Sequence, residues 1–291
     1  MNDDLWRRVL NRVLDLLPDE ERLDWQRDRA AVWRDDRWRG RFVGHASIDP
    51  VSLQDLLHLD HQKATLVQNT RQFVQGLPAN NALLWGARGT GKSSLVHAVL
   101  NDFADDGLRL VEVRKEELAA LADIVERLVA QPYRFIVFCD DLSFEAGEAS
   151  YKELKSALEG SIFRTAGNVL IYATSNRRHL LPEYMSDNQQ TRVGEVGELH
   201  EGEVVEEKIS LSDRFGLWLS FYAFRQDAYL DVVRHWVGAL ATAHDANLDL
   251  DDETMRAEAL RWALARGARN GRVAQHFARH WVGQRLLGAG A

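Results

Sequence analysis

One nine-residue stretch carries the spacing of a phosphate-binding loop. It consists of Gly86, Ala87, Arg88, Gly89, Thr90, Gly91, Lys92, Ser93 and Ser94. Glycines at this spacing let successive backbone N–H groups turn toward a phosphate chain, the lysine reaches the terminal phosphates, and the following hydroxyl can hold Mg²⁺. The helix expected to begin at Lys92 adds its positive dipole end. The stretch is therefore a Walker A motif, and it predicts a site for a nucleoside triphosphate with Mg²⁺ at Ser93.

Two aspartates follow an apolar segment further along the chain. Asp140 and Asp141 come directly after residues 135–139, which are apolar without alternation, as in a parallel strand covered on both faces. Carboxylates at the C-terminal end of a parallel strand lie at the crevice where ligands bind. We assign Asp140 to Mg²⁺, through water, and Asp141 to orienting and deprotonating the attacking water, as in a Walker B motif. Glu145 is the alternative base.

Polar residues also end the next apolar strand. Thr174, Ser175 and Asn176 follow residues 168–173. Because neighbouring parallel strands end at one edge of a sheet, we expect these side chains beside Asp140. Asn176 could then hydrogen-bond the attacking water or the γ-phosphate, although a simple turn is the alternative.

Arginines in the C-terminal half are candidates for sensing the γ-phosphate. Arg214 precedes a strand pattern at residues 217–221 and could reach the nucleotide of a neighbouring subunit, whereas a local pair with Asp213 is the alternative. Arg269 or Arg272, at a helix start, could report the phosphate state to the C-terminal helices. An ordinary surface arginine is the alternative for both.

Alternating strand and helix patterns must position these residues. Strand patterns occupy residues 81–85, 108–113, 135–139, 168–173 and 217–221. One helical pattern, at 51–76, precedes the first strand. Others lie between the strands, after Lys92, at 116–130 and at 149–159, and three more follow at 226–243, 252–266 and 270–286. Such alternation predicts a parallel sheet with right-handed crossovers, followed by a small helical bundle.

The N-terminal residues have a different character. Residues 5–17 carry apolar side chains at helical spacing, and a second, charged helical pattern contains Trp25 and Trp33. Arginine interleaved with tryptophan, as at residues 37–39, could stack on and neutralise single-stranded nucleic acid. Alternatively, the tryptophans dock these helices on the main domain. The glutamate-rich residues 188–208 predict a surface excursion, either solvated or a partner-docking segment.

Composition narrows the class of protein. The chain has 291 residues, 45% of them hydrophobic, and a formal net charge of −8, which argues against coating nucleic acid over the whole surface. The single cysteine, Cys139, excludes an internal disulfide. We expect a cytoplasmic protein without membrane contact, since the chain shows no signal-peptide pattern and no apolar run of about 18 residues. The ten histidines show no metal-ligand spacing.

The order of these motifs resembles that of the AAA+ ATPases. More closely, the chain resembles a bacterial AAA+ branch catalogued only as domain of unknown function 815, from about residue 50 to the end. The resemblance rests on residues 78–94, 138–144, 172–180 and 211–216.

The resemblance implies a fold and a set of roles. It implies a three-layer α/β P-loop fold with a five-stranded parallel sheet, the P-loop strand central, an α-helical lid, ATP with Mg²⁺, and a homo-oligomer. Asn176 takes the sensor-one role, Arg214 that of the arginine finger and Arg269 the sensor-two role. We expect a helical N-terminal segment, a nucleotide-binding domain and a lid at residues 1–48, 49–224 and 225–291.

This sequence departs from many AAA+ members in two places. Asp141 stands where a glutamate is frequent, which leaves the hydrolysis rate open. The short link between residues 113 and 116 lacks the glycine-and-aromatic pore loop of protein-threading unfoldases.

Three functional hypotheses follow. The leading one is an ATPase that hydrolyses ATP between subunits to remodel or load an unidentified macromolecular partner, protein or nucleic acid. The alternative is a nucleotide-gated binding module with negligible hydrolysis. A P-loop kinase of small molecules ranks third, since it would need phosphate-clamping arginines that the helical tail does not supply.

Overall fold

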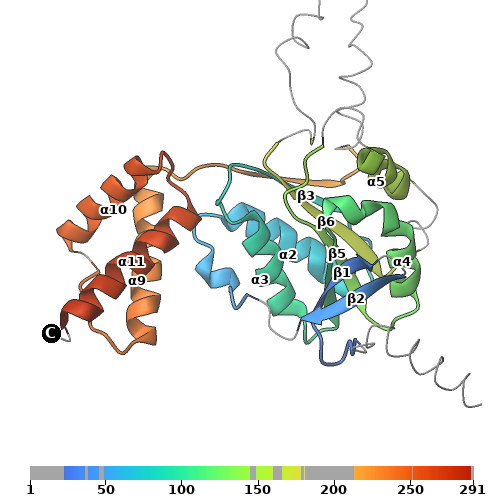
Figure 1. Ribbon diagram of the computed structural model, residues 1–291, viewed down its shortest axis with the longest axis horizontal. Helices are drawn as coiled ribbons and strands as arrows, with labels where there is room; N and C mark the ends of the chain where they lie inside the picture. The colour runs from blue at the N-terminus through green and yellow to red at the C-terminus, as the bar shows by residue number, and fades with distance from the viewer. Residues whose placement is uncertain are drawn as a thin grey trace, which may run out of the picture.

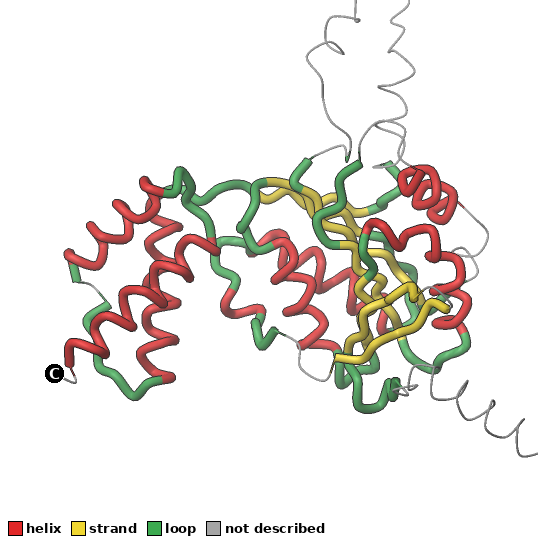
Figure 2. Tube along the Cα trace, viewed as in Figure 1, coloured by secondary structure: helices red, strands yellow, loops and turns green. Residues whose placement is uncertain are grey.

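The computed structural model describes residues 23–36, 39–45, 49–144, 149–159, 166–177, 180, 213–250 and 252–289. In this part of the chain, a sheet with helices on both faces stands beside a bundle of C-terminal helices (Figures 1 and 2). We call these the sheet body and the lid. Several sequence features lie outside the described residues: the helix expected at 5–17, Arg37, Trp38, Glu145 and the acidic residues 188–208.

The sheet contains seven strands in the order β2-β1-β4-β5-β6-β3-β7. Their bounds are β1 (Ala30–Asp36), β2 (Arg39–His45), β3 (Ala82–Gly86), β4 (Leu108–Glu112), β5 (Arg134–Cys139), β6 (Val169–Ser175) and β7 (Leu217–Phe221). Every neighbouring pair is parallel except β1 and β2, which form an antiparallel hairpin. The α/β class and the strands β3 to β7 are therefore as expected.

Two details of the expected sheet were wrong. The sheet has seven strands and not five, because residues around Trp33, expected to be helical, form β1 and β2 and extend the sheet beyond β4. The P-loop strand β3 is not central, since it lies between β6 and β7, next to the edge strand. Local motifs specify which residues form strands, but the strand order depends on pairings between distant segments.

Helices cover both faces of the sheet. One face carries η1 (Leu53–Asp55), α2 (Asp60–Val74) and α3 (Lys92–Phe103), and the other carries η2 (Lys115–Ala120), α4 (Leu121–Val129) and α5 (Ala149–Glu159). The expected helix at 116–130 thus begins as a 3₁₀ helix. The lid consists of α9 (Gln226–Ala243), α10 (Glu253–Ala265) and α11 (Gly271–Ala289), which share a hydrophobic core of their own.

The continuous apolar runs of the central strands follow from this layering. In β5, Ile136 and Phe138 join the core beneath α2 and α3, whereas Phe135 and Val137 join the core beneath α4 and α5. Both faces of the strand are buried, so no position needs to be polar. The non-alternating pattern correctly predicted a covered parallel strand.

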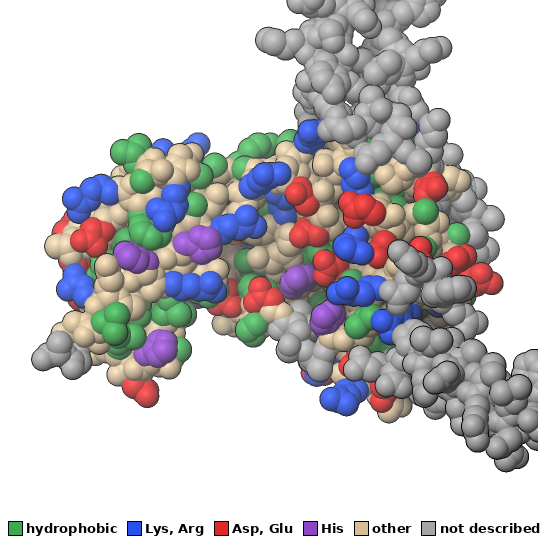
Figure 3. Space-filling view, in the orientation of Figure 1, with side chains coloured by type: hydrophobic (Ala, Val, Ile, Leu, Met, Phe, Trp, Pro, Cys, Tyr) green, Lys and Arg blue, Asp and Glu red, His purple; other side chains and the backbone are tan. Residues whose placement is uncertain are grey.

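The surface carries charges of both signs. On the face shown in Figure 3, basic and acidic side chains are interspersed over the sheet body and the lid. Among the helices of the described residues, none combines the length and the apolar character that crossing a membrane requires.

Two tryptophans of the N-terminal hairpin region, Trp25 and Trp33, belong to the core. Trp33 is 1% exposed, and its ring packs edge-on against Phe42 with 5.0 Å between centroids. A Cβ added at Gly40 would lie 2.0 Å from the Trp33 ring, so the indole occupies space that only glycine leaves open. Trp25 is also buried, against Phe135. These two rings are therefore inaccessible to nucleic-acid bases, and the docking interpretation holds for them, although Trp33 lies on β1 and Trp25 in the turn before it, and neither on a helix.

Replacing Trp33 tests this hairpin. We expect Trp33→Ala to lower the free energy of unfolding by about 3–5 kcal/mol, because it leaves a large cavity in the core. Trp33→Phe, which keeps an aromatic ring, should cost roughly half as much or less. Urea denaturation followed by circular dichroism measures both. A loss below about 1 kcal/mol for the alanine variant would show that the hairpin does not pack as described.

Candidate functional site

The P-loop connects β3 to α3 in a conformation that requires glycine. Gly86 has a φ of +133° and approaches β7 so closely that an added Cβ would lie 1.9 Å from the carbonyl oxygen of Phe221. Gly89, with a φ of +74°, lies against the side chain of Asn270 from the lid. Gly91, at +99°, precedes the first residue of α3. Each glycine of the motif therefore adopts a backbone conformation that residues with a Cβ rarely adopt.

Lys92, the first residue of α3, is 7% exposed. Its Nζ donates to the carbonyl oxygens of Gly86 and Ala87, both at 2.8 Å, and to Asn176 Oδ1 at 3.1 Å. Burial lowers the pKa of Lys92. The nearby carboxylates of the strand ends oppose this effect, whereas neighbouring arginines add to it.

The two aspartates after β5 contact residues at the start of α3 and at the end of β6. Asp140 Oδ1 accepts hydrogen bonds from Ser93 Oγ at 2.6 Å and from Thr174 Oγ1 at 2.5 Å. Asp141 has a φ of +50°, its backbone N–H donates to Thr174 Oγ1 at 2.9 Å, and its carboxylate accepts from the amide of Asn176. The structure thus brings together the residues proposed for metal binding, for water activation and for sensing.

Sequence reasoning placed Thr174 beside Asp140 but assigned it no role. This side chain is 1% exposed and joins the side chain of Asp140 to the backbone of Asp141. The parallel register places Cys139, the last residue of β5, opposite Ala173, and Asp140 and Thr174 directly follow these two residues. The available signal was the hydroxyl at the end of a buried strand, but its partners depend on that register.

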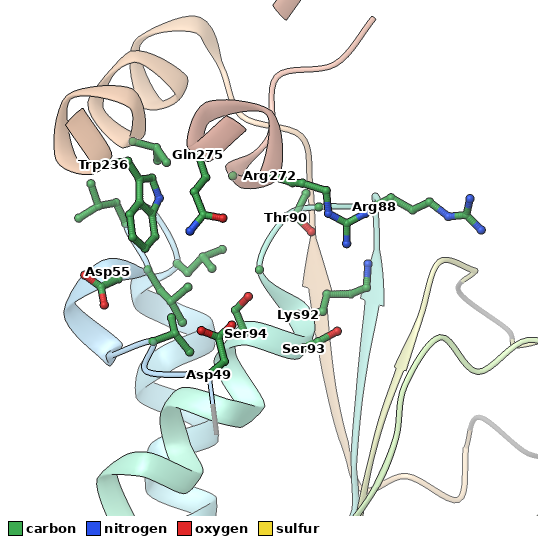
Figure 4. Close-up of a pocket in the computed structure, with 18 of the residues that line it drawn as sticks. Asp49, Asp55, Arg88, Thr90, Lys92, Ser93, Ser94, Trp236, Arg272 and Gln275 are labelled. Carbon is green, nitrogen blue, oxygen red and sulfur yellow. The ribbon is translucent and has the colours of Figure 1, made fainter. Parts of the chain in front are cut away.

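A cleft of about 730 Å³ opens between the P-loop and the lid. Its polar end is formed by the P-loop with Asp140, Asp141 and Asn176. Apolar side chains line part of the remaining wall: Val51, Leu56, Leu57, Leu59, Val232 and Trp236. Figure 4 shows Trp236 and Gln275 pointing down from the lid, and Arg272 extending over the P-loop toward Lys92. One end of the cleft therefore suits an anion and the other an apolar ring.

The lid contacts the tip of the P-loop directly. Asn270 Nδ2 donates to the carbonyl oxygen of Arg88 at 2.9 Å, and the backbone N–H of Arg272 donates to that of Gly89 at 3.1 Å. The Arg272 side chain lines the cleft, whereas Arg269 is exposed and does not. Of the two arginines that the sequence left as alternatives, Arg272 is the one near the phosphate end.

Arg214 lies away from the cleft of its own chain. It precedes β7, and the first residue of β7 pairs with Ala82 at the end of β3 that is remote from the P-loop. Both Arg214 and Asp213 are exposed, and neither lines the cleft. Any action of Arg214 on a nucleotide would therefore concern the cleft of another subunit.

The oxygen atoms beside the P-loop fit a magnesium ion. The Ser93 hydroxyl and the Asp140 carboxylate lie 2.6 Å apart at the start of α3. Hydroxyl and carboxylate oxygens are the protein ligands that Mg²⁺ uses when phosphates supply others. The two residues assigned from the sequence are thus close enough to share one ion.

Known proteins resemble this chain in sequence and in fold. A family model described as "Protein of unknown function (DUF815)" matches residues 26–285. The replication factor C large subunit of Methanococcus maripaludis is 26% identical over 172 residues, which cover 57% of this chain and only 35% of that protein.

Two solved structures share the fold. A mutant of RuvB from Thermotoga maritima aligns with a TM-score of 0.52 and 15% identity, covering 80% of this chain and 65% of that chain. ORC1 of Aeropyrum pernix, solved in complex with DNA, aligns with a TM-score of 0.51 and 17% identity, covering 75% and 57%. This similarity shows that the chain has the AAA+ fold.

Thr174 provides a test of the site geometry. We expect Thr174→Val to lower the free energy of unfolding by about 1–3 kcal/mol, because the Asp141 N–H loses its acceptor while the side-chain shape is kept. Thr174→Ser, which retains the hydroxyl, should cost less than about 1 kcal/mol. Denaturant titration of both variants measures the difference. A loss for Thr174→Val no larger than that for Thr174→Ser would contradict a stabilising role for the hydroxyl hydrogen bonds.

Proposed function

Because this chain belongs to the DUF815 family, for which no function is known, we propose an activity from its own site. The chain is an ATPase that binds ATP with Mg²⁺ and hydrolyses it. One observation carries this proposal: Asp140, on one side of the P-loop, shares a hydrogen bond with Ser93, while Asn176 joins Asp141 to Lys92. Phosphate-holding and water-activating groups thus form one connected network.

Binding uses both ends of the cleft. Backbone N–H groups of the P-loop, Lys92 and the N-terminus of α3 hold the phosphates. Ser93 and Asp140 would hold Mg²⁺, which would supply charge neutralisation for the bound phosphates. The apolar end, including Leu56 and Trp236, receives the base.

Hydrolysis uses the residues that follow β5 and β6. Asp141 orients the attacking water and takes its proton, and Asn176 holds that carboxylate in place through its amide. Arg88 lies 3.8 Å from the other oxygen of Asp141. Since both contacts engage the carboxylate, nucleotide binding must free one oxygen for water.

A neighbouring subunit completes the site in this proposal. Arg214 lies at the end of the sheet remote from its own P-loop, so it serves the γ-phosphate of the next subunit as an arginine finger. Head-to-tail contacts of this kind are heterologous and build rings or filaments. The energy serves to remodel or load a macromolecular partner, and nucleic acid is one candidate despite the net charge of −8.

A nucleotide-gated binding module is the second candidate. The contacts of Asp141 with Asn176 and Arg88 favour it, because a carboxylate held by two partners is a poor base. An aspartate also reaches one methylene less far than a glutamate. In this alternative the chain binds ATP and uses the lid position as its signal.

Turnover of mixed variants separates these candidates. We expect wild type to release phosphate from ATP with Mg²⁺, and Asp141→Asn and Arg214→Ala each to fall by about 100-fold or more. An equimolar mixture should regain activity, because about a quarter of randomly formed interfaces pair an intact Asp141 with an intact Arg214. Lys92→Met, expected not to bind ATP, is the control.

Two results would reject parts of the proposal. Equal, near-background rates for wild type and Asp141→Asn would favour the binding module. If the mixture is no more active than its components, the arginine does not act between subunits.

The two lid arginines provide a matched comparison. We expect Arg272→Ala to weaken ATP binding by about 10-fold or more and to affect ADP less, since its side chain extends toward Lys92 at the phosphate end. Arg269→Ala, three residues earlier and outside the cleft, should bind ATP as wild type does. Calorimetry or a fluorescent nucleotide measures both. The opposite ranking would return the sensor-two role to Arg269, as the family resemblance implied.

A further inference from the structure

Two histidine–aspartate pairs join the lid to the sheet body. His58 Nε2 lies 3.0 Å from Asp231 Oδ2, and His235 Nε2 lies 2.9 Å from Asp55 Oδ1. Asp55 and His58 belong to the sheet body, at η1 and before α2, whereas Asp231 and His235 lie on α9. The pairs are reciprocal, because each side supplies one carboxylate and one imidazole.

The backbone on each side orients these groups toward the other. Asp231 and His235 are four residues apart on α9 and therefore share one face of the helix. His58 has a φ of +59°, a conformation that non-glycine residues adopt rarely and at some cost. Its ring also lies near that of Phe224, with 6.4 Å between centroids. The segment before α2 thus holds a strained residue whose side chain contacts the lid.

Further hydrogen bonds hold the two carboxylates. Asp231 Oδ1 accepts from Arg234 at 3.0 Å, and Asp55 Oδ2 accepts from the backbone N–H and the hydroxyl of Ser52, each at 2.8 Å. Burial raises the pKa of Asp55, but the hydrogen bonds from Ser52 and His235 outweigh it, so that the pKa is lowered. Asp55 is therefore a carboxylate at neutral pH, able to accept from the lid imidazole.

The two pairs stand at the apolar end of the cleft. Leu56 and Leu57 directly follow Asp55, and Val232 and Trp236 adjoin Asp231 and His235 along α9; all four apolar side chains line the cleft. Leu57 also packs against the lid core. The lid thus touches the sheet body at both ends of the cleft, at the P-loop through Asn270 and here through the two pairs.

We propose that Asp55, His58, Asp231 and His235 are positioning residues that form a lid clamp. The clamp holds α9 against the sheet body before a ligand binds. It thereby also positions Trp236 of α9, which lines the cleft. Its effect on nucleotide affinity rests on the function proposed above, whereas its effect on lid position does not. Since the pairs are partly exposed, each contributes only modestly to the stability of the closed lid. Two contacts at separate points fix the position of α9 on the sheet body better than one contact would.

Lid position can be measured without nucleotide. The native Cys139 is 0% exposed, and burial raises its pKa to about 12, so it will not react with a spin label. Labels will therefore attach selectively to cysteines introduced by Asp102→Cys on α3 and Ala243→Cys on α9. Pulsed electron paramagnetic resonance then measures the distribution of distances between the label on the sheet body and the label on the lid. We expect one narrow distribution for the protein with an intact clamp.

Clamp variants should widen that distribution. In His58→Ala combined with His235→Ala, we expect a broad distribution and ATP binding weakened by about threefold to tenfold, with the change in KM and not in kcat. Asp55 stays unchanged because it also caps η1 through Ser52. His244→Ala, which removes an exposed imidazole just beyond α9, is the matched control and should leave the distribution narrow.

A charge swap distinguishes the pair itself from general loosening. His58→Asp alone places two carboxylates together and should displace the lid, whereas His58→Asp with Asp231→His restores the pair and the narrow distribution. Recovery supports the clamp. An unchanged distribution in the double alanine variant, or no recovery on swapping, overturns it. If wild type binds no nucleotide, the proposed function fails, and the label distances still decide the clamp.

Discussion

The hydrogen bonds that meet at Asp140 Oδ1 are the constraint on which the site depends. Ser93 donates from the first turn of α3 and Thr174 donates from the end of β6, so one carboxylate oxygen fixes a helix and two strands relative to each other. This is possible only because β5 and β6 are parallel and in a register that ends both strands at one edge. A slip of one residue would turn the Thr174 hydroxyl to the opposite face.

Much of the fold could be predicted because burial on both faces leaves a strong signal. The strands β3 to β7 are apolar wherever both cores touch them, and β7 and α5 have the expected bounds. The hairpin β1–β2 lacks that signal, since Ala31 and Trp33 are buried while Arg34 and Asp35 are exposed. The space for the Trp33 indole is provided by Gly40 on the partner strand. A pattern read along one segment cannot show a partner that lies across the hairpin.

The same distinction separates what could be predicted within the site. Lys92, Asp140 and Asn176 each stand at a recognisable strand or helix end, and parallel topology alone brings such ends together. The sequence alone does not show which of Arg269 and Arg272 lies at the cleft. That depends on how the lid docks on the P-loop through Asn270 and the backbone of Arg272. The histidine–aspartate pairs join residues 173 and 180 positions apart, and no local pattern links them.

The lid contacts the P-loop where two cations lie close together. The lid has an apolar core of its own, against which Leu57 of the sheet body packs. Hydrogen bonds around the cleft also join the lid to the sheet body. At the phosphate end these contacts use the carbonyl oxygens of Arg88 and Gly89, while Arg272 and Lys92 place two cations close together. A phosphate chain bound there would replace this repulsion with attraction and draw the lid toward the loop. The opposite end of the cleft would then act as the pivot, because its contacts involve no atom of the P-loop.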